Sequence, residues 1–188
     1  MGDRFIELLR STKRKGIEEL IDYLQNNGFF EAPASATHHN NKVGGLVDHT
    51  MSVYDTMRGL AATLGADNSL VTEEEIIITA LGHDLGKLGM YGKEMYVKKY
   101  LKNGKLSTTP YEINKELLPY PHEIRSLNIL HQFIKLTEAE EYAILFHATS
   151  LGELKYNYKQ PTALLMLLFF SDYWSSQILE SKVRESEY

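Results

Sequence analysis

Four histidines and two aspartates stand where the helices of this 188-residue chain would otherwise place core side chains. They are His49, His83, Asp84, His122, His147 and Asp172. Imidazole nitrogens and carboxylate oxygens suit Mn, Fe, Co, Ni or Zn. The chain has no cysteine, so thiolate sites and disulfides are excluded. The first hypothesis is therefore a divalent-metal centre built from nitrogen and oxygen ligands.

The most specific string is GHDLGK, residues 82–87, which contains His83 and Asp84 side by side. Apolar residues at positions 76, 77, 80 and 81 place one helix face in the core, and His83 and Asp84 continue that face. A buried carboxylate is costly unless it is paired or binds a metal. The position of this pair therefore favours a metal ligand over a solvated side chain.

The same pattern recurs in other segments. His49 lies on the apolar stripe of residues 46–60, His147 follows Ala143 and Ile144 at helical spacing, and Asp172 follows the apolar run 163–170. Taken singly, such a histidine is more often a satisfied core residue, and Asp172 could cap a helix or pair with an arginine. The ordered set of six makes metal binding the better interpretation.

The elements that must position these residues are mostly helical. We expect helices over residues 3–27, 46–64, 72–88, 121–134, 137–147 and 161–179. Thr72 with Glu75, and Thr137 with Glu140, form capping-box patterns. Pro121 and Pro161 suit first-turn positions. The sequence thus predicts an all-α bundle of about six main helices, one domain spanning residues 1–188 with the helix 3–27 packed on it.

Residues 91–120 do not read as helix. Asn103 and Gly104 between runs of Tyr, Val and Leu predict a β-hairpin, so we expect a small hairpin or long loop inserted here. Four lysines cluster around the turn, at positions 98, 99, 102 and 105. They fit an ordinary solvated hairpin, or a flap that draws in an anionic substrate.

Charge and composition indicate which binding partners and which cellular location to expect. The formal net charge of -5 argues against a dedicated duplex-DNA binder. The longest apolar run, residues 163–170, is far shorter than the ~20 residues of a membrane span. The absence of cysteine fits a cytoplasmic location. The 12 tyrosines and the apolar last helix are compatible with a homodimer interface or with a core.

The ordered set resembles the HD-domain superfamily of metal-dependent phosphohydrolases. The resemblance is carried by GGLVDHT around His49, GHDLGK, PHEIRS around His122, FHATS around His147 and FFSDYW around Asp172, and it covers roughly residues 40–180. In that superfamily the residues matching His49, His83, Asp84 and Asp172 bind a first metal. Residues matching His122 and His147 occur in the subset with two metals, where the Asp84 equivalent bridges them.

The resemblance implies a phosphodiesterase or phosphatase that acts on a nucleotide or short oligonucleotide. Two ions about 3.5–4 Å apart would activate a shared hydroxide for attack on phosphorus. Asp84 is then expected to orient the nucleophile. Lys87 would hold a phosphate oxygen, although a solvated lysine is the alternative. His39 and Ser126 are weaker candidates for substrate contact, and the loop pair His38 and His39 could equally be solvated.

Two other functions stay open. Some HD-fold proteins with six such ligands hold a di-iron pair and cleave C–C or C–P bonds with oxygen, although the HDLGK string is more similar to the hydrolases. A regulatory module that binds a nucleotide without turnover is the third interpretation, which the intact ligand set disfavours.

Overall fold

The computed structural model describes residues 1–66, 68–149 and 161–181. Within them the chain is mostly helical with one small hairpin region, as expected. The helices are α1 (Gly2–Ser11), α2 (Ile17–Asn26), α3 (Gly45–Thr63), α4 (Glu73–Gly82), α5 (His122–Leu130), α6 (Glu138–Phe146) and α8 (Ala163–Trp174). A 3-10 turn, η1 (Leu85–Leu88), follows α4, and a π-helical turn, η2 (Ser175–Leu179), continues α8.

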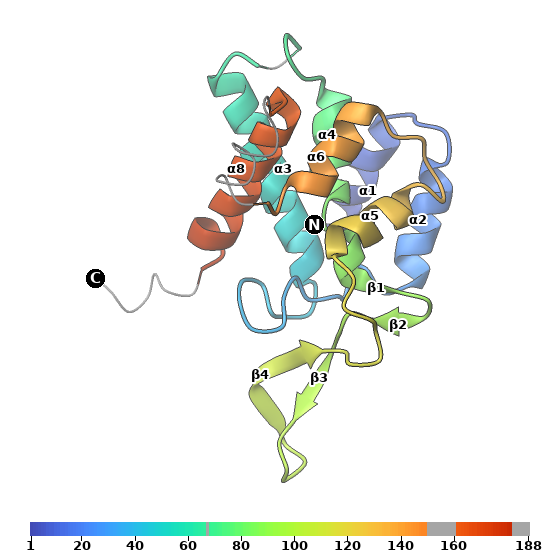
Figure 1. Ribbon diagram of the computed structural model, residues 1–188, viewed down its shortest axis with the longest axis vertical. Helices are drawn as coiled ribbons and strands as arrows, with labels where there is room; N and C mark the ends of the chain where they lie inside the picture. The colour runs from blue at the N-terminus through green and yellow to red at the C-terminus, as the bar shows by residue number, and fades with distance from the viewer. Residues whose placement is uncertain (67, 150–160, 182–188) are drawn as a thin grey trace, which may run out of the picture.

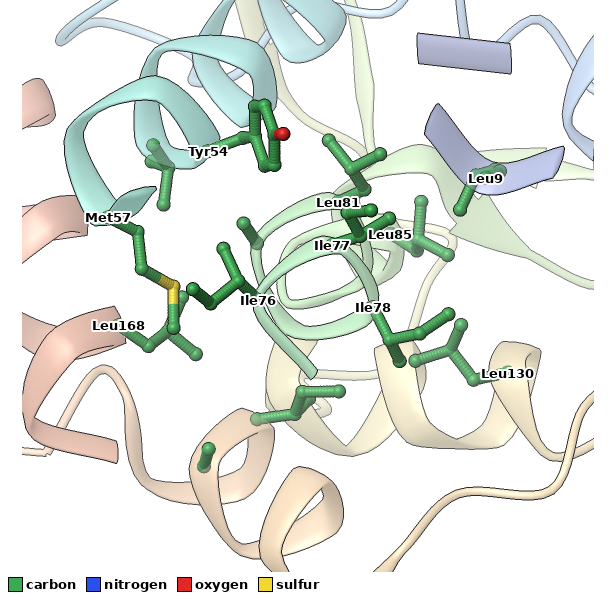
Figure 2. Packing of buried hydrophobic residues seen from close by; sticks show 14 of the residues in the cluster. Leu9, Tyr54, Met57, Ile76, Ile77, Ile78, Leu81, Leu85, Leu130 and Leu168 are labelled. Atoms are coloured by element: carbon green, nitrogen blue, oxygen red, sulfur yellow. The ribbon is translucent and has the colours of Figure 1, made fainter. Parts of the chain in front are cut away.

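Helix α4 forms the centre of the core. All its residues from Ile76 to Gly82 are buried, and it packs on α1, α3, α6 and α8. Figure 2 looks along this helix and shows Ile76, Ile77 and Ile78 reaching in different directions toward neighbouring helices. A helix that is apolar on every side must lie inside the domain. The segment that carries His83 and Asp84 therefore leaves the middle of the core.

The prediction of a single helix over residues 3–27 is wrong, because the helical conformation is interrupted between α1 and α2. Lys13 and Gly16 adopt left-handed backbone angles, with φ of 53° and 90°. Arg14 in this break pairs with Glu74 and with the fully buried Glu140, at N–O distances of 2.6 and 2.8 Å. A straight helix could not bring Arg14 to both carboxylates, so the break ties the N-terminus to α4 and α6.

Several helix ends also differ from expectation, among them that of the helix expected over residues 121–134, which ends at Leu130. The helix expected to reach Leu88 ends at Gly82 and gives way to the 3-10 turn η1. Pro161 lies outside α8, whose N-cap is Thr162, and Pro121 is the N-cap of α5. Both capping boxes are confirmed: the hydroxyl groups of Thr72 and Thr137 accept the backbone N–H of Glu75 and Glu140, and the backbone N–H of each threonine donates in return to the glutamate carboxylate.

The expected hairpin is present. Strands β3 (Tyr96–Tyr100) and β4 (Leu106–Ile113) pair antiparallel, and the short β1 (Gly89–Met90) and β2 (Lys93–Glu94) form a second pair. Figure 1 shows β3 and β4 projecting from one end of the helical body. The turn includes Gly104 with φ of 78°, which glycine adopts without steric cost. No helix among the described residues has the length and apolar character needed to cross a bilayer.

The break at Gly16 makes a stability prediction. A Cβ added at Gly16 would lie 1.8 Å from the carbonyl oxygen of Phe133, in a left-handed conformation. We expect Gly16→Ala to lower the free energy of unfolding by about 3 kcal/mol or more, measured by chemical denaturation. Gly65→Ala is the control, because Gly65 has φ of +63° but a Cβ there would meet no described atom within 4 Å. It should cost only about 1 kcal/mol; equal losses would contradict the clash.

Candidate metal centre

The carboxylate of Asp84 is the hub at which the expected ligands meet. Asp84 is 1% exposed, at the point where α4 gives way to η1. Its Oδ1 lies 3.1 Å from Nε2 of His122 and 3.7 Å from Nε2 of His147. Its Oδ2 lies 3.2 Å from Nε2 of His49 and 3.4 Å from Nε2 of His83. Each oxygen of one carboxylate therefore faces a different pair of imidazoles.

Asp172 completes the side that faces Oδ2. Its Oδ1 lies 3.2 Å from Nε2 of His49. Ligand atoms of His49, His83 and Asp172 lie within 4.8 Å of one another, and the same is true of His83, Asp84 and His147. The six expected ligands thus converge, from five segments: α3, the end of α4, the start of α5, the end of α6, and α8.

In each of the buried histidines His49, His83 and His147, Nδ1 faces away from Asp84 and lies against a hydrogen-bond acceptor. Nδ1–H of His83 donates to the carbonyl of Ala80 at 2.8 Å, and that of His147 donates to the carbonyl of Ile144 at 2.7 Å. Both histidines are helix C-caps, where backbone carbonyls lack helical partners. Nδ1 of His49 lies 3.0 Å from a carboxylate oxygen of Glu180. These bonds assign the proton to Nδ1 and leave the Nε2 lone pair for the centre.

Apart from the ion pair of Asp84 with Lys87, the inward atoms have no ordinary hydrogen-bond partner among the described residues. Nε2 of His49, Nε2 of His83 and both oxygens of Asp84 are buried, and their mutual contacts lack hydrogen-bond geometry. Buried polar atoms are normally satisfied. Donor atoms that converge without bonding one another fit a shared cation, so these buried His and Asp groups could hold a metal ion.

Charge is strongly coupled across the centre. Burial by itself would lower the pKa of His49, but the neighbouring carboxylates of Asp172, Asp84 and Glu180 outweigh it and raise that pKa well above its usual value. Burial would raise the pKa of Asp84, but the charges of Lys87 and His83 hold it well below its usual range. The metal-free centre therefore keeps its carboxylates ionised and a proton on His49.

Lys87 is the cation nearest to this cluster. Its Nζ lies 2.6 Å from Oδ2 of Asp84, and its side chain is only 14% exposed. Burial acts to lower the pKa of Lys87, but the charges of Asp84 and Asp172 outweigh it and raise that pKa above its usual value. The sequence expectation of a cation beside the centre is thus matched in position, one turn beyond His83.

The two weaker candidates have different outcomes. The His39 ring lies 4.8 Å from the His49 ring, and burial lowers the pKa of His39 to about 4, so it is neutral at pH 7. Its neighbour His38 is exposed. Ser126 is fully buried; its hydroxyl donates to the carbonyl of His83 and accepts the N–H of Gly86. Its hydroxyl thus fixes the turn after α4, and contact of Ser126 with a substrate stays a prediction.

Glu180 was not anticipated from the sequence. The last helix was expected to end near Leu179, and a lone glutamate after it has no distinctive pattern. Its spacing of eight residues from Asp172, roughly two helical turns, is the one available signal. The turn η2 packs on α3 and brings Glu180 back to His49.

Side-chain exposure shows how the centre is reached. His49, His83 and His147 are at most 2% exposed. His122 and Asp172 have side chains 24% and 21% exposed. A ligand would therefore approach at these two residues. Models of protein families, curated proteins and solved structures were compared with the chain, and none of them matches it.

The protonation of His49 predicts a pH dependence of metal binding. The raised pKa means that a metal must displace the His49 proton, so affinity should fall as pH drops below that value, by about tenfold per pH unit for each proton displaced. Titration calorimetry with Zn²⁺ in buffers of different ionisation enthalpy would count the released protons between pH 6 and 8. His131→Ala, which removes a half-exposed histidine paired with Glu141, should change nothing. A pH-independent affinity would contradict this reading.

Proposed function

We propose that the chain is a metal-dependent phosphohydrolase of the HD-domain superfamily that cleaves a phosphoester of a nucleotide. The observation that carries the proposal is the placement of Asp84 between two pairs of imidazoles, with the Nε2 atoms of His49 and His83 near Oδ2 and those of His122 and His147 near Oδ1. A carboxylate so placed fits a bridge between two divalent ions. In the bound state such ions supply an activated hydroxide and offset charge on phosphate oxygens.

The chain's own residues have separate parts in this proposal. His49, His83 and Asp172 would hold one ion, and His122 with His147 the other, while Asp84 is shared. The hydrogen bonds on Nδ1 keep three of these imidazoles neutral and aimed inward when metals replace the proton on His49. Ser126 restrains the backbone at His83 and Gly86 on either side of Asp84, so the shared carboxylate has little freedom to turn.

Lys87 suits a substrate anion. Its ammonium is held beside the centre by Asp84, and its raised pKa keeps it charged at any physiological pH. A fixed point charge of this kind can hold a phosphate oxygen and stabilise the charge that develops during transfer. In the hydrolase proposal, Lys87 therefore binds the substrate phosphate, a role that a purely structural metal site would not require.

Elemental analysis tests the centre itself. Protein purified without chelator should contain close to two metal ions per chain. His122→Ala should bring the number toward one, because Nε2 of His122 faces only the Oδ1 side of Asp84. His131→Ala is the matched control, a histidine just beyond α5 that lies on the surface. One metal unaffected by His122→Ala would remove the second ion from the proposal. No metal after reconstitution with Mn²⁺ or Fe²⁺ would refute the catalytic proposal.

Hydrolysis tests the reaction. With bis(p-nitrophenyl) phosphate as substrate, Lys87→Met should lower kcat about 10²-fold while the metal content stays unchanged. Lys93→Met is the control, since Lys93 is a half-exposed lysine paired with Glu116 away from the centre. Loss of metal together with activity would instead give Lys87 a structural part. The reaction should also proceed without oxygen; a product that requires oxygen and iron would indicate the di-iron oxygenase.

A further inference from the structure

A cavity of about 410 Å³ lies between the hairpin and the segment around residues 27–43. Tyr96, Lys98 and Tyr111 line one side of it. Tyr96 and Lys98 are two residues apart on β3, and Tyr111 pairs with Lys98 across the ladder, so the three share one face of the hairpin. The opposite wall is formed by Ala32, Pro33 and Val43.

The cavity borders the metal centre at Lys87, and its lining includes none of the six ligand-type residues. Lys87 lines its inner end together with Leu88, and the same ammonium lies 2.6 Å from Oδ2 of Asp84. Tyr96 lines the same cavity as Lys87. One molecule could therefore occupy the cavity and extend an anionic group to the ammonium of Lys87.

The walls suit a flat apolar group that also makes a few polar contacts. Tyr111 is 8% exposed and Tyr96 is partly buried, and the hydroxyl groups of both lack hydrogen bonds to the described part of the chain. Small-molecule sites are typically about 300–1,000 Å³ with aromatic walls, so this volume suits one heterocycle and its sugar. Any nucleobase can stack on a tyrosine ring, because every base has a π-face.

Charge differs between the two ends of the cavity. The inner end has the ammonium of Lys87, whereas the mouth has the exposed side chains of Glu31, Glu94 and Lys98, two negative charges and one positive, a sum of -1. An exocyclic amino group would find carboxylate acceptors at this mouth.

The geometry points to a base-binding subsite that takes one amino-bearing nucleobase and directs its phosphate to Lys87, beside the metal centre. The assignment rests on the proposed phosphohydrolase function and narrows its substrate to a nucleotide with an amino-bearing base.

Methyl NMR tests the subsite directly. Met95 lines the cavity, whereas Met57 lies in the core beside Leu168, so their ¹³C-methyl signals report on two places in one sample. Adenosine 5′-monophosphate should shift the Met95 methyl through the ring current of its base and leave Met57 unchanged. Ribose 5-phosphate, which lacks the base, should bind about tenfold more weakly and give no such shift. Equal affinities, or no shift of Met95, would overturn the assignment.

A charge reversal at the mouth tests the preference for an amino-bearing base. Wild-type protein should bind adenosine 5′-monophosphate several-fold more tightly than inosine 5′-monophosphate, whose base has a carbonyl oxygen in place of the exocyclic amino group. The double variant Glu31→Lys, Glu94→Lys should reverse this order, and because both side chains are exposed the fold should be kept. The control is Glu112→Lys, an exposed residue next to Tyr111 in β4 but outside the cavity lining. An unchanged order in the double variant would overturn the assignment of the mouth.

The failure of this inference can be told from failure of the proposed function. The titrations are run on metal-free and on Zn²⁺-loaded protein, because stacking on Tyr111 does not need metal. A Met95 shift without metal binding or hydrolysis would refute the phosphohydrolase and leave a nucleotide-binding cavity. Hydrolysis without a Met95 shift would refute the cavity alone. A Met95 signal that changes with protein concentration and not with nucleotide would assign the cavity to contact between copies, and would also overturn it.

Discussion

A buried carboxylate determines the arrangement of this protein. Asp84 leaves the apolar helix α4 in the middle of the core and is 1% exposed. A carboxylate is rarely stable there unless cations surround it. The chain meets this constraint with Lys87 at 2.6 Å and with four imidazoles drawn from separate segments. The packing of those segments around α4 is therefore the condition under which Asp84 can stay ionised.

The ends of helices carry most of the site. His83 and His147 stand at the C-caps of α4 and α6, where each imidazole donates to a carbonyl that the helix leaves free. This local bond fixes which nitrogen faces inward, and it needs no residue from elsewhere. Ser126 then links α5 to the turn after α4. If the centre holds a metal as proposed, metal affinity and local stability would be coupled, because the same backbone groups serve both.

The hairpin gives the centre a second wall. Its face with Tyr96 and Tyr111 lies over Lys87, while the helical body supplies every expected metal ligand. In the proposed function, reactive groups and recognition groups would be held by different parts of the chain. The hairpin and the segment before α3 could then change substrate preference without disturbing the charge balance around Asp84.

The sequence by itself determined the helical class, both capping boxes, the hairpin at Gly104 and the six ligand-type residues. These depend on local patterns: apolar periodicity, cap chemistry and turn residues. Only the tertiary structure decided the interruption between α1 and α2. It depends on the close approach of Gly16 to the backbone of Phe133 and on the ion pair of Arg14 with the buried Glu140. Packing likewise turned Ser126 inward and brought Glu180 to His49. Contacts between residues far apart in the sequence produce no local pattern such as apolar periodicity. They could therefore not be predicted before the packing of distant segments was known.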